Sequence, residues 1–175
     1  MNGSTATLAT WCWPVLSLMA CSPALNWREV RPPNSGVLAM FPCKPAHEMR
    51  RVPLAGPPVS LAIQACSTGE VTYALSYADV GDPTRVGPAL QSLRAAVVSN
   101  VSGRLSSQRP LQIPGMTPHP EAVQFEVQGH LPNGSAVKER AAVFSKGTRV
   151  FQATVFGAPL DAEASETFFG GLRLP

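Results

Sequence analysis

The chain has 175 residues, which is enough for one domain with a buried core but few for two. Hydrophobic residues make up 45% of it and charged residues 14%, a composition that excludes a largely disordered protein. The formal net charge is only +3 and Arg50-Arg51 is the one adjacent basic pair, so nothing indicates a nucleic-acid partner, which would need clustered Lys and Arg.

The amino-terminal segment contains no charged side chain before Arg28. Residues 5–20 are apolar or small, and their length and Pro14 suit the apolar region of an export signal better than a transmembrane helix. The segment ends at residues 18–21 in Leu-Met-Ala-Cys, which resembles the bacterial lipobox. The resemblance implies that residues 1–20 are a signal peptide and that Cys21 receives diacylglycerol, anchoring the protein to a membrane.

The first four residues lack the Lys or Arg that export signals normally carry, so either the true start lies upstream or the signal is weak. An uncleaved hydrophobic anchor, ordinary signal cleavage and a cytosolic chain remain alternatives. Ser22 follows the cysteine in place of Asp, as in lipoproteins sent to the outer membrane. We therefore expect a lipidated tether at 21–26 and a single domain at 27–175, on the periplasmic face of a membrane in the cell envelope.

The first part of this domain has the alternating pattern of β-strands, interrupted by turns rich in Pro and Gly. The pattern predicts strands at residues 27–30, 37–41, 48–54, 59–66 and 71–77. The last two are expected to form a hairpin through the Ser67-Thr68-Gly69 turn.

A helix is predicted next. Asp82 is a good N-cap and Pro83 suits the first helical position. Apolar residues then recur every three or four positions, at Val86, Leu90, Leu93, Val97 and Val101. Gly103 is expected to end the helix.

The second part of the domain begins with a proline-rich stretch at 104–120, which we expect to be a long irregular loop. Strands are predicted at 123–127, 137–144 and 150–156, joined by a type I′ turn at Asn133-Gly134 and a tight turn at Lys146-Gly147. A short helix from Asp161 would bring three apolar side chains to the core, those of Phe168, Phe169 and Leu172. The predicted class is α+β, an antiparallel sheet flanked by helices.

The order of these elements, the Phe-Pro-Cys-Lys-Pro segment at 41–45 and the closing Phe-Phe-Gly-Gly-Leu-Arg-Leu at 168–174 resemble the PsbP-like fold. That fold includes the photosystem II extrinsic subunit and bacterial lipoproteins of the DcrB and LpqN kind. The chain is more specifically similar to uncharacterised proteobacterial lipoproteins with paired cysteines at these places. The resemblance implies binding or assembly more than catalysis, and it carries over no active-site residue.

Four cysteines are present. Lipidation would use Cys21 and signal cleavage would remove Cys12, which leaves Cys43 and Cys66 in an oxidising compartment. Each lies at or just after the end of a predicted strand, so we expect a disulfide between them. Two unrelated thiols remain the alternative, and a zinc site formed with the three histidines is less favoured: His47, His119 and His130.

No catalytic, metal-binding or nucleotide-binding motif stands out. The chain has no Gly-x-Ser-x-Gly elbow, no His-x-x-x-His spacing and no glycine-rich phosphate loop after a strand, so no catalytic residue, metal or cofactor is assigned. Glu126 and Glu139 are expected on adjacent strands, on one solvated sheet face close to Lys138 and Arg140, where cross-strand charge pairing explains them.

The sequence therefore favours an envelope protein that acts in protein interaction or assembly, with an unidentified protein partner. The candidate partner-binding residues are the apolar side chains of the proline-rich stretch, Leu111, Ile113 and Met116. Closing the open end of the sheet is an equally good role for them. Binding of a small apolar or lipid ligand between helix and sheet is the alternative function, and an enzyme is less favoured.

Overall fold

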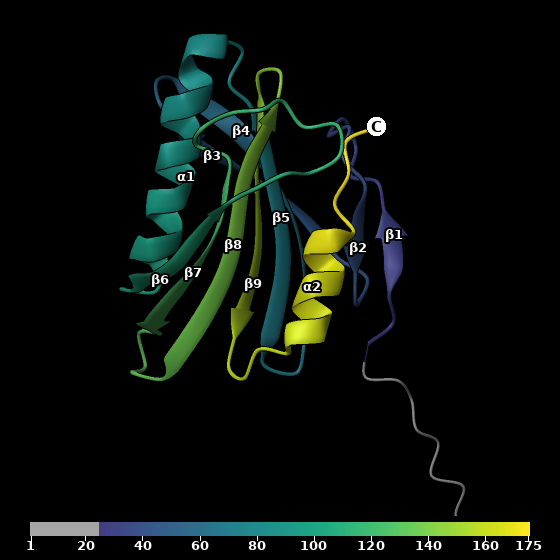
Figure 1. Ribbon diagram of the computed structural model, residues 1–175, viewed down its shortest axis with the longest axis vertical. Coiled ribbons are helices and arrows are strands. Elements are labelled where there is room, and N and C mark those ends of the chain that lie inside the picture. Colours follow the sequence, from purple (N-terminus) through teal and green to yellow (C-terminus); the bar gives the residue numbers. More distant parts are fainter. Residues whose placement is uncertain (1–24) are drawn as a thin grey trace, which may run out of the picture.

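The computed structural model describes residues 25–175 (Figure 1). Residues 1–24, with the expected signal peptide and Cys21, lie outside the described part. The described chain has the expected α+β character, although strands dominate it. Neither helix within residues 25–175 combines the length and apolar character needed to cross a bilayer.

Seven strands form one antiparallel sheet. In spatial order they are β3 (Ala46–Pro53), β4 (Pro58–Thr68), β5 (Val71–Asp79), β9 (Arg149–Gly157), β8 (Ala136–Lys146), β7 (Val123–His130) and β6 (Arg104–Pro110). β3–β5 and β6–β9 are thus two meanders, and the pairing of β5 with β9 joins them in the middle of the sheet.

One face of the sheet is covered by α1 (Val86–Asn100), which packs on β7, β8 and β9. Asp82 caps the short 3-10 turn Pro83–Arg85 before it by accepting a hydrogen bond from the Thr84 N–H (2.8 Å). The predicted apolar stripe faces the sheet, and Leu90 and Val97 are fully buried in it. The prediction of this helix is confirmed.

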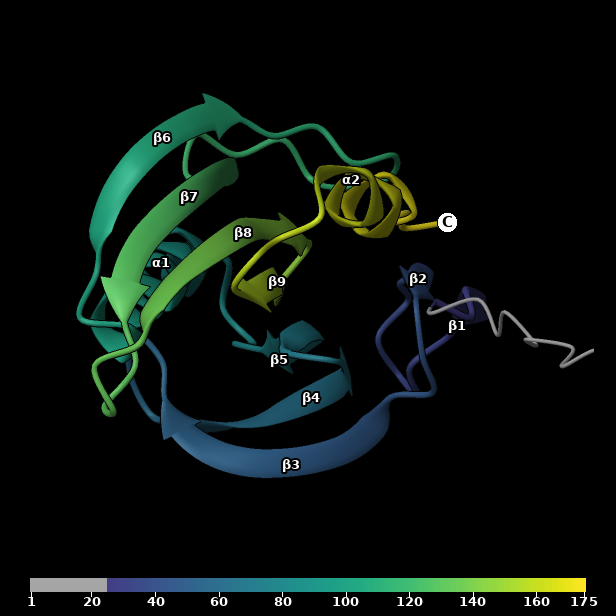
Figure 2. The same ribbon diagram turned by 90° about the horizontal axis from the view of Figure 1, so that it is seen from below.

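The other face is covered by α2 (Ala162–Gly170) and by the separate hairpin β1 (Arg28–Val30) and β2 (Ala39–Phe41), as Figure 2 shows from below. α2 begins where the short helix was expected, and Asp161 caps it. The Phe168 ring packs edge-on against Phe41 of β2 and Tyr73 of β5, with centroids 5.3 and 5.5 Å apart. The sheet therefore has a separate apolar core on each face.

The hairpin is fastened to the sheet by the predicted disulfide. Cys43, just after β2, bonds to Cys66 of β4 across a Cα–Cα distance of 5.9 Å, within the range that a disulfide needs. This confirms the pairing expected from the sequence.

The expectation of an irregular chain throughout 104–120 is wrong for its first part. Residues 104–110 form β6, an edge strand paired with β7, and every residue of it is exposed. An edge strand exposed on both faces needs no alternating apolar pattern, so the sequence carried no periodic signal for it.

The turn between β7 and β8 also differs from the expected type I′. That type requires positive φ at both central residues, whereas only Gly134 of the Asn133-Gly134 pair has one (83°). His130 pairs with Ala136, so residues 131–135 all belong to the turn. A two-residue turn would have paired Pro132 with Ser135, one position away from the observed register.

This change of register corrects the expected position of Glu139. A shift of one residue reverses the face of every side chain in a strand. Glu139 lies opposite Val127 on the α1 face and is buried, whereas Glu126 lies opposite Arg140 on the α2 face. The expected cross-strand pairing holds for Glu126 and Arg140, whose Oε1 and Nε are 3.3 Å apart, but not for Glu139.

Candidate functional site

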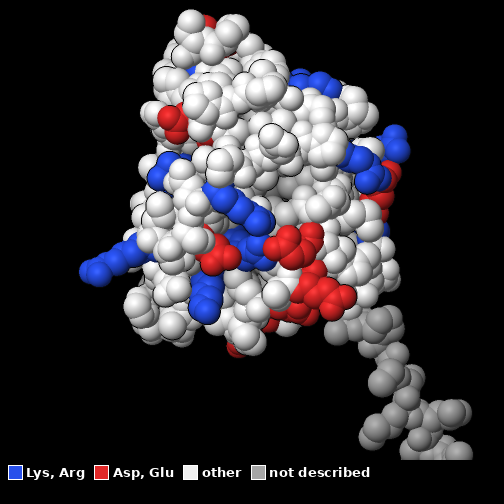
Figure 3. Space-filling view, in the orientation of Figure 1, with Lys and Arg blue, Asp and Glu red and all other residues white. Residues whose placement is uncertain are grey.

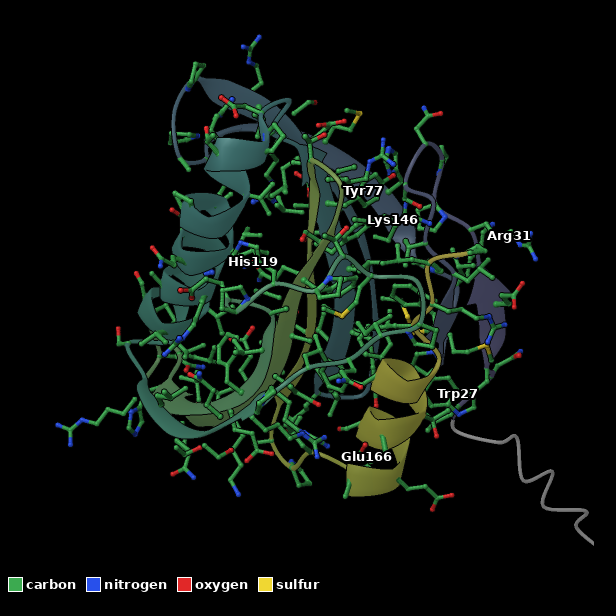
Figure 4. All side chains as sticks on the ribbon, turned by 45° about the horizontal axis from the view of Figure 1, so that its top comes forward. Trp27, Arg31, Tyr77, His119, Lys146 and Glu166 are labelled. Carbon is green, nitrogen blue, oxygen red and sulfur yellow. A yellow bond between two sulfur atoms is a disulfide. The ribbon has the colours of Figure 1, made fainter. Side chains whose placement is uncertain are left out.

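The chain between β6 and β7, residues 111–122, passes from the carboxyl-terminal tail to the side of α1 (Figure 1). We call it the 111–122 loop. At its far end the His119 ring lies beside α1, close enough that a Cβ on Gly87 would be 3.3 Å from its Cε1 (Figure 4). The His119 Nδ1 also accepts a hydrogen bond from the Glu121 N–H (3.1 Å).

Backbone hydrogen bonds hold the middle of this loop. The Leu174 N–H donates to the Pro114 carbonyl oxygen and the Thr117 N–H to the Ser145 carbonyl oxygen, both at 2.8 Å. Gly115 lies so close to the tail that a Cβ there would be 1.6 Å from the Leu174 oxygen. The loop is therefore fastened both to the tail and to the end of β8.

The structure brings the three predicted residues of this loop together. Ile113 is buried in the core on the α2 side of the sheet, and Leu111 and Met116 are half-buried against the same core. The Met116 Sδ also accepts a hydrogen bond from the Ile113 N–H (3.1 Å). Ile113 thus closes the core, while Leu111 and Met116 keep part of their surface outside it.

These side chains border a hollow of about 760 Å³ between the loop and the ends of β6 and β7. Its lining is mainly apolar, and the bulky apolar side chains that the loop contributes are those of Leu111, Ile113, Met116, Pro118 and Pro120. The polar exceptions include Arg109 and His119. We call this the loop hollow.

A charged cluster adjoins the loop hollow on the part of the sheet that α2 leaves uncovered. The Arg140 guanidinium of β8 lies over the Phe169 ring (5.6 Å to the centroid) and donates from Nη2 to Glu166 of α2 (2.7 Å). That hydrogen bond holds the pKa of Glu166 below its ordinary value. Basic and acidic side chains meet in the middle of this face in Figure 3, and Figure 4 places Glu166 on α2.

The cluster continues across β7 to β6. Arg109 donates from Nε and Nη2 to the Gln124 Oε1, at 3.2 and 2.8 Å. The same Arg109 lies 4.0 Å from the Glu166 carboxylate. Two arginines, two glutamates and one amide from four elements thus share a polar surface beside the loop hollow.

The histidines and cysteines do not converge. Cys43 and Cys66 are bonded to each other, and the His47 ring makes its contact with the Gln64 amide (2.7 Å). Within residues 25–175 no group of three or more His, Cys, Asp or Glu side chains is placed to hold a metal ion.

The apolar residues of the loop are recognisable in the sequence, whereas the cluster beside it is not. Arg109, Gln124 and Arg140 come from three different strands, and they share a face only in the observed registers of β6, β7 and β8. The alternation of polar residues along 124–128 was the available signal, because these side chains lie opposite the buried Val123, Phe125 and Val127. The face of the sheet on which Arg140 of β8 lies could be predicted only with the correct turn between β7 and β8.

No family model and no curated protein matches this chain. A crystal structure of a Pseudomonas aeruginosa protein of unknown function is weakly similar, with a TM-score of 0.39 and 16% sequence identity. That similarity covers 80% of this chain and 88% of the other.

Proposed function

We propose that this protein is a lipid-anchored envelope protein that binds another protein through the 111–122 loop and the adjoining part of β6. Residues 1–20 would be removed, Cys21 would carry the lipid, and the outer membrane is the favoured location. No catalytic role is proposed for any residue. We also propose that the fold is PsbP-like; the burial of Leu172 and Leu174 from the closing segment supports this, since such a segment characterises that fold.

The observation that carries the binding proposal is the fastening of the 111–122 loop to the tail and to β8. A loop held in one conformation loses little conformational entropy when a partner binds, so more of the contact energy appears as affinity. The half-buried Leu111 and Met116 then supply apolar contact area at a fixed position. Figure 3 shows that the surface above the charged side chains is largely uncharged, which suits a protein interface.

Binding of a small apolar ligand between α1 and the sheet is less well supported. Ala89, Leu90 and Val97 of α1 have no exposed surface, because they pack directly on the sheet. A ligand at that position would have to separate the helix from β7–β9. The loop hollow is the better place for apolar contacts.

Photo-crosslinking in cells would test the proposal. A benzophenone amino acid placed at Pro118 of the full chain, at the border of the loop hollow, should give an adduct of one defined protein mass. The matched control is the same group at Arg51 of the exposed strand β3, on the opposite edge of the sheet. Loss of the adduct in a Leu111→Glu background would support binding through the loop.

Two outcomes would contradict the proposal. An identical adduct from position 51 would mean that the capture does not depend on the loop. A lipid-sized adduct at position 118, in place of a protein-sized one, would favour the apolar-ligand function.

A further inference from the structure

Two buried nitrogen donors beside the loop hollow lack acceptors among the described residues. They are the Gln124 Nε2 and the Arg140 Nε. Gln124 is 6% exposed, and its orientation is determined because both Arg109 donors bind its Oε1. Glu126 Oε1 lies 3.3 Å from the Arg140 Nε, close enough for an ion pair but without the geometry of a hydrogen bond. Buried donors are rarely left unsatisfied. Because these two nitrogen atoms are almost fully covered, an acceptor from outside reaches them only when a neighbouring side chain, such as that of the exposed Glu126, moves aside.

Both side chains line one small hollow, of about 180 Å³, over β6, β7 and β8. It lies on the sheet face between Ser107, Arg109, Gln124, Glu126 and Arg140. Gln108 and Arg109 border this small hollow and the loop hollow alike, so the two are adjacent. A bound molecule that extends past these residues would contact both.

The charges around the small hollow indicate which acceptor it suits. Arg109 and Arg140 are balanced by Glu126 and Glu166, which lie within 4.0 Å of one or the other. An added carboxylate or phosphate would have to compete with Glu126 and Glu166 for the two arginines that line this hollow. An uncharged acceptor, such as the carbonyl oxygen of an amide, satisfies the two donors without that cost.

The positions of Gln124 and Arg140 suit a peptide in extended conformation. Gln124 lies opposite Ala142 and Glu126 opposite Arg140, so Gln124 and Arg140 are diagonal neighbours on one face. The backbones of such neighbours are about 7–8 Å apart, similar to the repeat of alternate carbonyl groups along a strand.

We propose that the small hollow recognises the main-chain amides of an extended, uncharged segment of the partner protein. Gln124 Nε2 and Arg140 Nε donate to its carbonyl oxygens, and its apolar side chains lie in the loop hollow. This inference rests on the proposed function for the identity of the partner, but the donors of the small hollow can be tested without any partner.

The test is a titration of the ¹⁵N-labelled full chain with N-acetyl-L-leucine N-methylamide, followed by NMR. This probe has two amides and one apolar side chain. We expect saturable shifts of the Gln124 side-chain NH₂ and the Arg140 Nε–H signals. N-acetyl-L-leucine, which carries a carboxylate in place of the second amide, should bind more weakly.

Two variants isolate the donors. Gln124→Glu keeps an oxygen for Arg109 but removes the free N–H, and Arg140→Lys keeps the charge but removes the Nε donor. Either should weaken probe binding roughly tenfold, the effect of one lost hydrogen bond. Gln152→Glu is the matched control, since it makes the same change on the opposite face of the sheet and should leave binding unchanged.

Absence of a saturable shift would overturn the inference and leave the small hollow to solvent. Equal affinity of the Gln124→Glu variant, or tighter binding of the carboxylate probe, would overturn it as well. The photo-crosslinking experiment can fail while this titration succeeds, which would reject the protein partner but retain the amide site. The reverse result would retain the partner and reject the amide site.

Discussion

Glu139 is an acidic residue on the α1 face of the sheet, where its cross-strand neighbours are apolar. It lies between Val127 of β7 and Phe156 of β9, and 7% of its surface is exposed. Burial raises the pKa of its carboxyl group from 4.5 to about 7. The folded protein therefore binds this proton more tightly than the unfolded chain, and the stability gained from it is fully present below pH 4.5 and is lost as the pH rises through 7.

We predict that Glu139→Gln removes this part of the pH dependence. At pH 8 the variant should have a larger free energy of unfolding than the natural protein, by up to about 3 kcal/mol, whereas near pH 4.5 the two should be similar. Urea unfolding at several pH values measures the difference. Glu70→Gln, in the exposed turn before β5, is the control, and parallel profiles for natural protein and Glu139→Gln would contradict the prediction.

Gly115 and Gly134 require glycine for different structural reasons. Both have positive φ, 80° and 83°, but only Gly115 lies against other atoms, those of Leu174. Gly134→Ala should therefore cost about 1–2 kcal/mol, the strain of a left-handed residue with a side chain. Gly115→Ala should cost at least about 2 kcal/mol more, since the loop must also move away from the tail. Equal losses in chemical unfolding would show that the tail does not hold the loop.

Among the elements, the β1–β2 hairpin depends most on a covalent link. The Cys43–Cys66 bond has a sequence separation of 23. Closing a loop of that size in the unfolded chain stabilises the folded protein by about 3 kcal/mol in the chain-entropy model.

We predict that the double substitution Cys43→Ser and Cys66→Ser lowers the free energy of unfolding by about that amount. Urea unfolding measures the loss, and reduction of the natural protein should reproduce it. Thiol labelling of the unfolded, unreduced protein provides the control. Labelling of both cysteines before reduction would show that the bond is absent.

Elements with a strong local pattern were predictable from the sequence, and elements that depend on their neighbours were not. The cap at Asp82 and the apolar stripe of α1 are local, and so are the alternating residues of β4 and β5. β6 becomes a strand only through its pairing with β7, because its own residues are exposed on both faces.

The same distinction applies to the candidate site. The apolar residues of the 111–122 loop can be recognised in the sequence because the prolines around them mark a loop. The group formed by Arg109, Gln124 and Arg140 cannot, since one misjudged turn between β7 and β8 sends Arg140 to the wrong face. A site formed by residues from several strands can be predicted only when the pairing registers of those strands are predicted correctly.

At the scale of the whole molecule, we predict attachment to a membrane through a lipid on Cys21. This residue lies outside the described residues. We predict that Cys21→Ser moves the protein from the membrane fraction to the soluble fraction. Mass spectrometry of the natural protein should show diacylglycerol on an amino-terminal Cys21. An intact Met1 on membrane-bound protein would reject the prediction.

The pairing of β5 with β9 has a consequence for the order of folding. In every other pair of neighbouring strands in the main sheet, the two strands also follow each other in the sequence. β5 and β9 do not, and their pairing extends from Asp79 opposite Arg149 to Thr72 opposite Phe156. Closing so long a segment costs entropy before any contact is gained, which slows folding. The two meanders should therefore form early, and their docking should limit the rate.

Stopped-flow kinetics can separate these events. Val127→Ala, inside the β6–β9 meander, should slow folding, because its contacts are present in the transition state. Val155→Ala, where β9 meets Tyr73 of β5, should mainly speed unfolding. A newly made chain would then spend its longest waiting time as two partly folded halves, each exposing a central strand that only the other half can pair.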